Sequence, residues 1–207
     1  MSEHGGPEGR RAQRPGDAAQ IVLVRHGETE WSLSGQHTGN TDIPLTDAGR
    51  RQAETIGARL APWTFARVLS SPLSRALETC RLAGLGERAE VTDDLREWDY
   101  GDYEGRRTVD IRKERPGWTL WTDGVPGGEA VEDVGRRVDR VLDAARDAGG
   151  DVALFAHGHV LRVLGARWIG LAPEYGGRLK LATATLCVLG WERETPAVER
   201  WNDIADT

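Results

Sequence analysis

The sequence predicts an α/β protein of three layers, a sandwich in which helices cover both faces of a mostly parallel sheet. Two apolar runs, residues 21–24 and 152–155, are each followed by one further residue and then by His-Gly. A continuous apolar run that leads to a glycine is typical of a buried strand entering its loop. Amphipathic helical patterns alternate with these runs, as in parallel sheets. Because such sheets hold ligands at the carboxyl ends of their strands, both histidines are expected at one crevice.

The first half of the chain alternates strands and helices. Thr46 suits a helix N-cap, and apolar residues recur at helical spacing from there to Leu60. Pro72 suits the first position of a helix. The expected elements are a strand at 21–24, a long polar loop at 27–45, a helix at 46–60, a strand at 67–71, a helix at 72–83 and a short edge strand at Val91.

The second half begins with a segment rich in Trp, Gly, Asp and Arg, residues 95–128, which predicts a loop-rich cap. Val134, Val138 and Val141 then lie on one face of a helical pattern. The expected elements are a short helix at 108–114, a helix at 130–148, a strand at 151–155, a helix at 160–168 and a closing hairpin of strands at 183–191 and 197–201.

Composition favours one domain over residues 20–207 that follows a disordered tail, residues 1–19. With 207 residues, of which 39% are hydrophobic, the chain is long enough to bury a core. The net charge of -6 argues against binding to nucleic acid or to an anionic membrane. Cys80 and Cys187 form no paired motif, so we expect reduced core thiols. Neither a spanning segment nor a signal peptide is visible in the sequence, which predicts a cytoplasmic protein.

Histidine and arginine together suggest chemistry on phosphorus. A histidine nucleophile needs cations for the phosphoryl oxygens and an acid for the leaving group. His26 would be the nucleophile, Arg25 and Arg75 would bind phosphoryl oxygens, and His157 would supply a further donor. Arg75 lies in the expected first turn of its helix, where the helix dipole also favours an anion.

Five stretches of the chain, in order, resemble the motifs of the histidine phosphatase superfamily, which has the phosphoglycerate mutase-like fold. Any one of them alone is weak, but together they extend over nearly everything after residue 20. They are Leu23–Trp31 with its Arg-His-Gly-Glu, Thr38–Thr46, Ser71–Ala76, Leu95–Gly101 and Phe155–His159.

The resemblance implies that His26 becomes a phosphohistidine, with Arg25, Arg75 and His157 around the phosphate. It places Glu97 as the proton donor to the leaving oxygen and then as the base that activates water. It implies no cofactor and no metal, since the arginines supply positive charge. The residues that it places at the substrate are Thr38, Gly39, Tyr100, Gly158 and Ser32. Ser32 stands where many members carry Asn, and the phosphatase branch that the chain resembles, with acid phosphatases and sugar-bisphosphate phosphatases, has serine there.

Phosphatase and mutase chemistry share the phosphohistidine, and the short segment between Glu97 and Gly128 favours hydrolysis of a small phosphomonoester. Mutase-type transfer stays an alternative, because a basic cluster at 106–115 leaves room for a second anionic group. A metallohydrolase that uses His26, Glu28, His157 and His159 is disfavoured, because two arginines make a bound dication costly. A non-catalytic phosphate-binding module is disfavoured because the histidine and the acid are both present. The roles of His37 and His159 and the pairing of subunits into a homodimer stay open.

Overall fold

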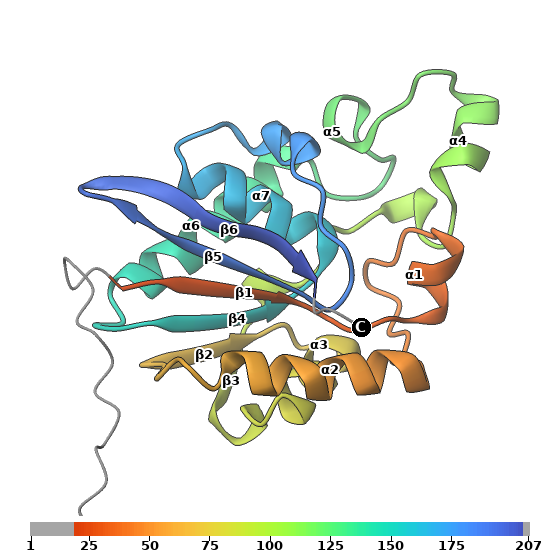
Figure 1. Ribbon diagram of the computed structural model, residues 1–207. Helices are drawn as coiled ribbons and strands as arrows, with labels where there is room; N and C mark the ends of the chain where they lie inside the picture. The colour runs from red at the N-terminus through yellow and green to blue at the C-terminus, as the bar shows by residue number, and fades with distance from the viewer. Residues whose placement is uncertain (1–18, 205–207) are drawn as a thin grey trace, which may run out of the picture.

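The computed structural model describes residues 19–204 and contains a six-stranded sheet in the order β3-β2-β4-β1-β5-β6 (Figure 1). Strands β1 to β4 run parallel to one another, β5 pairs antiparallel with β1, and β6 pairs antiparallel with β5. The bounds of the strands are β1 Ile21–Arg25, β2 Arg67–Ser70, β3 Ala89–Val91, β4 Val152–Ala156, β5 Thr185–Glu192 and β6 Thr195–Ile204. The expected mostly parallel sheet, its edge strand at Val91 and its closing hairpin are confirmed.

Helices cover both faces of the sheet, as the three-layer prediction requires (Figure 1). Helices α2 (Asp47–Leu60) and α3 (Ser74–Leu82) pack on one face, and α6 (Val131–Arg146) and α7 (Gly158–Trp168) pack on the other. Side chains of β1 alternate between these layers, with Leu23 toward α6 and α7 and Val24 toward α2 and α3. Because both faces of the central strands are buried, β1 at 21–24 and β4 at 152–156 are apolar at every position.

Two details of the expected elements are wrong. The polar loop at 27–45 contains a helix, α1 (Glu30–Ser34), which begins in a capping box between Thr29 and Ser32. Pro72 is not the first helical residue, because α3 begins at Ser74, whose backbone N–H donates to the Asp42 carboxylate at 2.9 Å. That carboxylate caps the helix from another loop, which no local pattern indicates.

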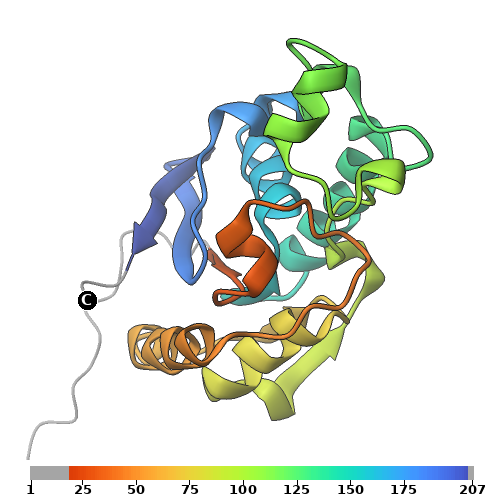
Figure 2. The same ribbon diagram turned by 90° about the vertical axis from the view of Figure 1, so that its right-hand side faces the viewer.

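The segment 95–128 folds into short helices around its own aromatic core. Trp118 is buried edge-on against Tyr103, with 5.3 Å between ring centroids. Figure 2 looks onto the end of the molecule toward which β1 runs, with α1 in the middle and this segment above it. The expected helix at 108–114 is confirmed. The short helices of the chain are η1 Gly86–Arg88, η2 Asp93–Leu95, η3 Gly101–Tyr103, α4 Thr108–Glu114, α5 Leu120–Asp123 and η4 Pro173–Arg178.

The expected tail lies outside the described residues, except Ala19, whose carbonyl accepts a hydrogen bond from Trp191. Cys80 and Cys187 are free and buried in the core. Within residues 19–204, no helix is long and apolar enough to cross a membrane.

The end of β1 touches the start of α2 at two glycines. A Cβ atom on Gly27 would lie 2.3 Å from the carbonyl oxygen of Gly49, so the two backbones approach as closely as glycine allows. The loop that carries His26 is therefore held directly against α2.

We predict that Gly27→Ala lowers the free energy of unfolding by about 1–3 kcal/mol, because the backbones must separate to admit a methyl group. Gly150→Ala is the matched control, since its Cβ would meet only the Ala66 methyl, at 3.1 Å. Urea unfolding of both variants measures the difference. Equal midpoints would contradict the importance of this contact.

Candidate active site

His26 and His157 meet at the carboxyl ends of β1 and β4, which are neighbouring parallel strands. The backbone N–H of His26 donates to the Ala156 carbonyl at 3.0 Å, and the two ring centroids are 5.2 Å apart. The two histidines therefore meet at one edge of the sheet, as expected, but of the two only His26 lines the cavity there.

The His26 ring is oriented by its own loop. Its Nδ1 lies 2.7 Å from the Gly27 carbonyl oxygen, which can only accept, so Nδ1 carries the proton and Nε2 keeps its lone pair. Burial lowers the pKa of His26 well below its usual range, and the charges of Arg25 and Arg75 lower this pKa further. A neutral imidazole with a free Nε2 is the form that attacks an electrophile.

His157 lies behind His26 and is fully buried. Nε of Arg75 donates to Nδ1 of His157 at 3.1 Å, so Nε2 of that ring carries the proton and donates to Oγ of Ser71 at 2.7 Å. Burial, with the nearby charge of Arg75, lowers the pKa of His157 well below the usual value. His157 is therefore a neutral donor beside His26.

Arg75 is also fully buried, and it organises the loop that follows α1. Its Nη atoms donate to the carbonyl oxygens of Thr38, Gly39 and Thr41 at 3.0–3.1 Å. The guanidinium places a fixed positive charge behind both histidines. Its predicted contact with a phosphoryl oxygen stays a prediction.

Arg25 lies at the cavity with a buried donor that has no partner among the described residues. Its Nη1 donates to the Leu181 carbonyl at 2.6 Å. Within residues 19–204, its Nε is the buried side-chain nitrogen or oxygen atom that lacks a hydrogen-bond partner. Gly158 lets the guanidinium approach α7, since a Cβ there would lie 3.2 Å from Cζ of Arg25. An N–H of this kind is costly to bury unless an acceptor reaches it.

The Glu97 carboxylate is held by the first turn of α7. Oε2 accepts the backbone N–H of His159, and Oε1 accepts those of Val160 and Trp98, each at 2.9 Å. The positive end of a helix dipole stabilises a carboxylate in this position. Oε1 has two donors and Oε2 has one, so Oε2 keeps the freer lone pair.

Tyr100 and His159 form a buried pair next to this carboxylate. The Tyr100 hydroxyl lies 2.6 Å from Nδ1 of His159. Burial raises the pKa of Tyr100 well above its usual range and lowers the pKa of His159 well below, so the hydroxyl donates to a neutral ring. Both side chains line the cavity.

These groups surround a cavity of about 260 Å³. Of the expected site residues, Gly39 and the buried pair Arg75 and His157 lie outside its lining, and Gly39 instead donates its N–H to Glu104. The Ser32 hydroxyl is already engaged in the cap with Thr29. The residues that line the cavity are Arg25, His26, Thr29, Trp31, Ser32, Gly35, Gln36, His37, Thr38, Glu97, Tyr100, Thr108, Gly158, His159, Arg162 and Leu181.

Two members of the considered metal set, Glu28 and His157, are engaged elsewhere. Glu28 accepts the Thr46 hydroxyl at 2.7 Å, and Nδ1 of His157 accepts from Arg75. In the described part of the chain, no group of three or more His, Cys, Asp or Glu side chains is arranged to hold a metal ion.

A family model decides the relationship that the five motifs indicate. The model of the histidine phosphatase superfamily (branch 1) matches residues 21–204. The chain belongs to this superfamily. Its relatives include an acid phosphatase of Mycobacterium tuberculosis, 43% identical over 177 residues that cover 84% of this chain and 87% of the relative. Sedoheptulose 1,7-bisphosphatase of Saccharomyces cerevisiae is 38% identical over 193 residues, 77% of this chain and 71% of the relative.

Solved structures agree with this assignment. A functionally characterised open reading frame of Mycobacterium tuberculosis has a TM-score of 0.87 and 39% identity, over 91% of this chain and 99% of the other. A mycobacterial glucosyl-3-phosphoglycerate phosphatase has a TM-score of 0.79 and 28% identity, over 90% of this chain and 100% of the other. The chain is thus a phosphatase of the histidine phosphatase superfamily.

Sequence reasoning missed Arg162, which lines the cavity of this histidine phosphatase from α7. Its guanidinium stacks on Trp121, 4.6 Å from the ring centroid, and donates to the carbonyls of Gly176 and Gly177. The sequence does indicate that Arg162 lies near the site, because it follows His159 by one helical turn on the same helix.

The basic cluster at 106–115 lies outside this cavity, and the acidic side chains of the same segment take up three of its charges. Arg106 pairs with Glu114, and Asp110 pairs with both Arg107 and Lys113. Backbone pairing instead connects this segment to the site, since His37 donates to the Arg106 carbonyl at 2.9 Å.

Burial lowers the pKa of His37 to about 4, so the histidine stays neutral in the folded protein down to that pH. The unfolded chain takes up the proton near pH 6.5, and stability is therefore lost as the pH falls from about 6.5 to 4. We predict that His37→Gln reduces this loss by up to about 1.4 kcal/mol per pH unit, measured by urea unfolding.

Thr108→Ala is the control, because it removes the hydroxyl 3.3 Å from Nε2 of His37 and keeps the titrating ring. It should retain most of the wild-type slope. A His37→Gln protein with the full wild-type slope would contradict the assignment.

Proposed function

We propose that this protein hydrolyses small phosphomonoesters through a phosphohistidine at Nε2 of His26, without a metal ion. The observation that carries the proposal is the neutral His26 ring beside Arg25, whose buried Nε–H has no partner among the described residues. A phosphoryl oxygen supplies the acceptor that this N–H lacks, and the bound phosphorus then lies next to the nucleophile.

In the first step, the Nε2 lone pair forms a bond to phosphorus and the ester P–O bond breaks. Glu97 in its carboxylic acid form gives a proton to the departing alkoxide, and its Oε2, which accepts a single backbone N–H, is the atom suited to carry that proton. In the second step, Glu97 as carboxylate removes a proton from water. The water oxygen bonds to phosphorus, the P–N bond breaks, and inorganic phosphate leaves.

The size and the charge of the cavity favour a small substrate that carries a second anionic group. Its volume of about 260 Å³ suits a metabolite, and Arg162 supplies a cation beside Glu97, His159 and Tyr100. Relatives named acid phosphatase and sedoheptulose 1,7-bisphosphatase support hydrolysis of sugar phosphates. Mutase-type transfer is the second candidate, because a probable phosphoglycerate mutase of Yersinia enterocolitica is 31% identical over 88% of this chain.

We predict that the protein releases phosphate from p-nitrophenyl phosphate in the presence of EDTA and that His26→Ala abolishes this activity. The fall should reach about 10⁴-fold or more, because the nucleophile is lost and no covalent intermediate forms. Rapid acid-free quenching with labelled substrate should trap a base-stable, acid-labile phosphoenzyme in the wild type alone.

Three results would overturn the assignment. EDTA-sensitive turnover would indicate metal chemistry, and no turnover on any phosphomonoester would indicate a binding module. Isomerisation of 3-phosphoglycerate, primed with its bisphosphate, faster than phosphate release would favour the mutase.

We predict that Glu97→Gln lowers kcat/KM by about 10²-fold for an alkyl phosphate and by less than about 10-fold for p-nitrophenyl phosphate. A poor leaving group needs the proton, whereas p-nitrophenolate leaves without it. Glu28→Gln is the matched control, since its carboxylate accepts from Thr46 and lies outside the cavity lining. Equal losses on both esters would remove Glu97 from the acid role.

A further inference from the structure

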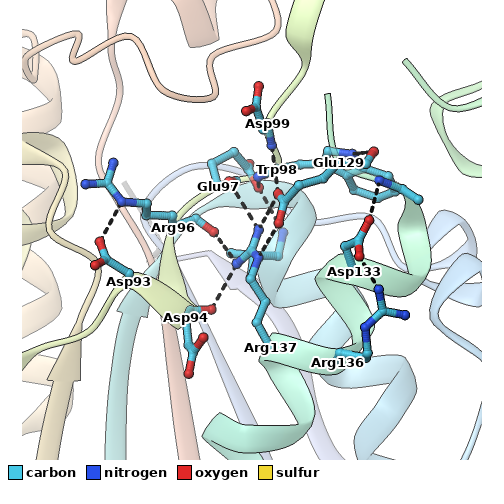
Figure 3. A network of polar contacts seen from close by, with 12 residues as sticks. Asp93, Asp94, Arg96, Glu97, Trp98, Asp99, Glu129, Asp133, Arg136 and Arg137 are labelled. Atoms are coloured by element: carbon cyan, nitrogen blue, oxygen red, sulfur yellow. Dashed lines mark hydrogen bonds and ion pairs between the residues drawn. The ribbon is translucent and has the colours of Figure 1, made fainter. Parts of the chain in front are cut away.

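Arg137 is a nearly buried arginine of α6 whose guanidinium donates to the segment that carries Glu97 and to Glu129 (Figure 3). Nη1 donates to the carbonyls of Asp94 and Arg96 at 2.9 and 2.6 Å, and Nη2 donates to the carbonyl of Glu97 at 3.2 Å. The guanidinium therefore binds the backbone carbonyls of Glu97 itself and of the residue before it.

Glu129 completes the arrangement from the turn that precedes α6. Its carboxylate receives Nε and Nη2 of Arg137 at 2.9 and 3.1 Å. The same carboxylate accepts the backbone N–H of Asp99 at 2.9 Å, and the Glu129 carbonyl accepts Nε1 of Trp98 at 2.9 Å. Arg137 and Glu129 thus hold the chain on both sides of Glu97, and we name the pair the Arg137–Glu129 clamp.

The clamp uses each of the five N–H donors that an arginine has, two on Glu129 and three on backbone carbonyls. None is left for a substrate, and Arg137 is absent from the cavity lining. Charge-assisted bonds in a fixed planar fork resist displacement more than neutral ones do. The bonds of the clamp therefore hold the chain around Glu97 in a fixed position.

The position that it holds is that of the Glu97 carboxylate. The carboxylate reaches the first turn of α7, while the backbone of the same residue is tied to α6 through Arg137. Glu97 spans these two helices, and its Oε2 can deliver a proton only while both ends stay fixed.

We propose that Arg137, anchored by Glu129, is a positioning residue that fixes Glu97 for proton transfer to the leaving group. This inference rests on the proposed function, in which Glu97 is the acid. Arg137→Lys retains the charge and loses the planar fork of donors, and Glu129→Gln retains one acceptor oxygen and loses the charge.

The test measures kcat/KM for Arg137→Lys and Glu129→Gln with an alkyl phosphate and with p-nitrophenyl phosphate, because kcat/KM reports the step that expels the alcohol. For each variant, we expect a loss of about 10-fold to 10²-fold on the alkyl ester and at most a few-fold on the aryl ester. Arg140→Gln is the matched control, since it lies one turn along α6 and pairs with the exposed carboxylate of Asp94. It should leave both values unchanged.

A double variant separates positioning from a general structural role. If the clamp acts through Glu97, Arg137→Lys combined with Glu97→Gln loses no more on the alkyl ester than Glu97→Gln alone. Multiplied losses, or equal losses on both esters, would overturn the clamp. Should Arg137→Lys fail to fold, Glu129→Gln and its own double variant with Glu97→Gln carry the same test.

The acid role of Glu97 and the positioning role of the clamp can be overturned separately. A normal leaving-group effect in Glu97→Gln, with clamp variants that behave like wild type, overturns the clamp alone. Equal losses of Glu97→Gln on both esters overturn the acid assignment and the clamp together.

Discussion

The pairing of β1 with β4 is the constraint on which the site depends. Their parallel register places Arg25 opposite Ala156, and the bond from the His26 N–H to the Ala156 carbonyl continues it by one step beyond the strands. A slip of one residue would turn every side chain of β1 to the other face of the sheet, since strand side chains alternate. Leu23 and Val24 would then exchange helix layers. The burial of both faces therefore fixes the register of β1 against β4. This register in turn fixes where the two histidines meet.

Fixed positive charge is the second element of the site, and backbone carbonyls hold it in place. Arg25 donates to Leu181, Arg75 to the loop at 38–41, and Arg162 to Gly176 and Gly177. Charges that are held before a substrate arrives stabilise a transition state without reorganisation. Burial, together with the charges of Arg25 and Arg75, lowers the pKa values of His26 and His157 and keeps both rings neutral. An environment that suits a phosphoryl group is thus also the one that keeps the nucleophile unprotonated.

The sequence predicted those elements whose burial in the fold leaves a recognisable pattern of apolar residues. The strands at 21–24 and 152–155 are recognisable because full burial makes them apolar throughout, and α2 is recognisable from Thr46 and its periodic apolar face. The motifs also located His26, Glu97 and His157. Contacts between distant segments could not be predicted, such as the Asp42 cap that moves the start of α3 to Ser74, or the carbonyls that engage Arg75. The role of the charges at 106–115 stayed open for the same reason, because three of them find acidic partners within their own segment, outside the cavity.

Helix α7 connects Arg25 and Glu97 to the part of the cavity that Arg162 lines. Its first turn carries Gly158 against Arg25 and supplies the N–H groups that hold Glu97, and its next turn carries Arg162. A helix is stiff over two turns, so a shift that brings Arg162 closer to a substrate group also moves the donors of Glu97. The clamp from α6 opposes such a shift by holding the Glu97 backbone independently of α7. In the proposed mechanism, this division lets residues along the cavity wall differ without moving the acid, because the backbone of Glu97 is held from α6 and only its carboxylate is held from α7.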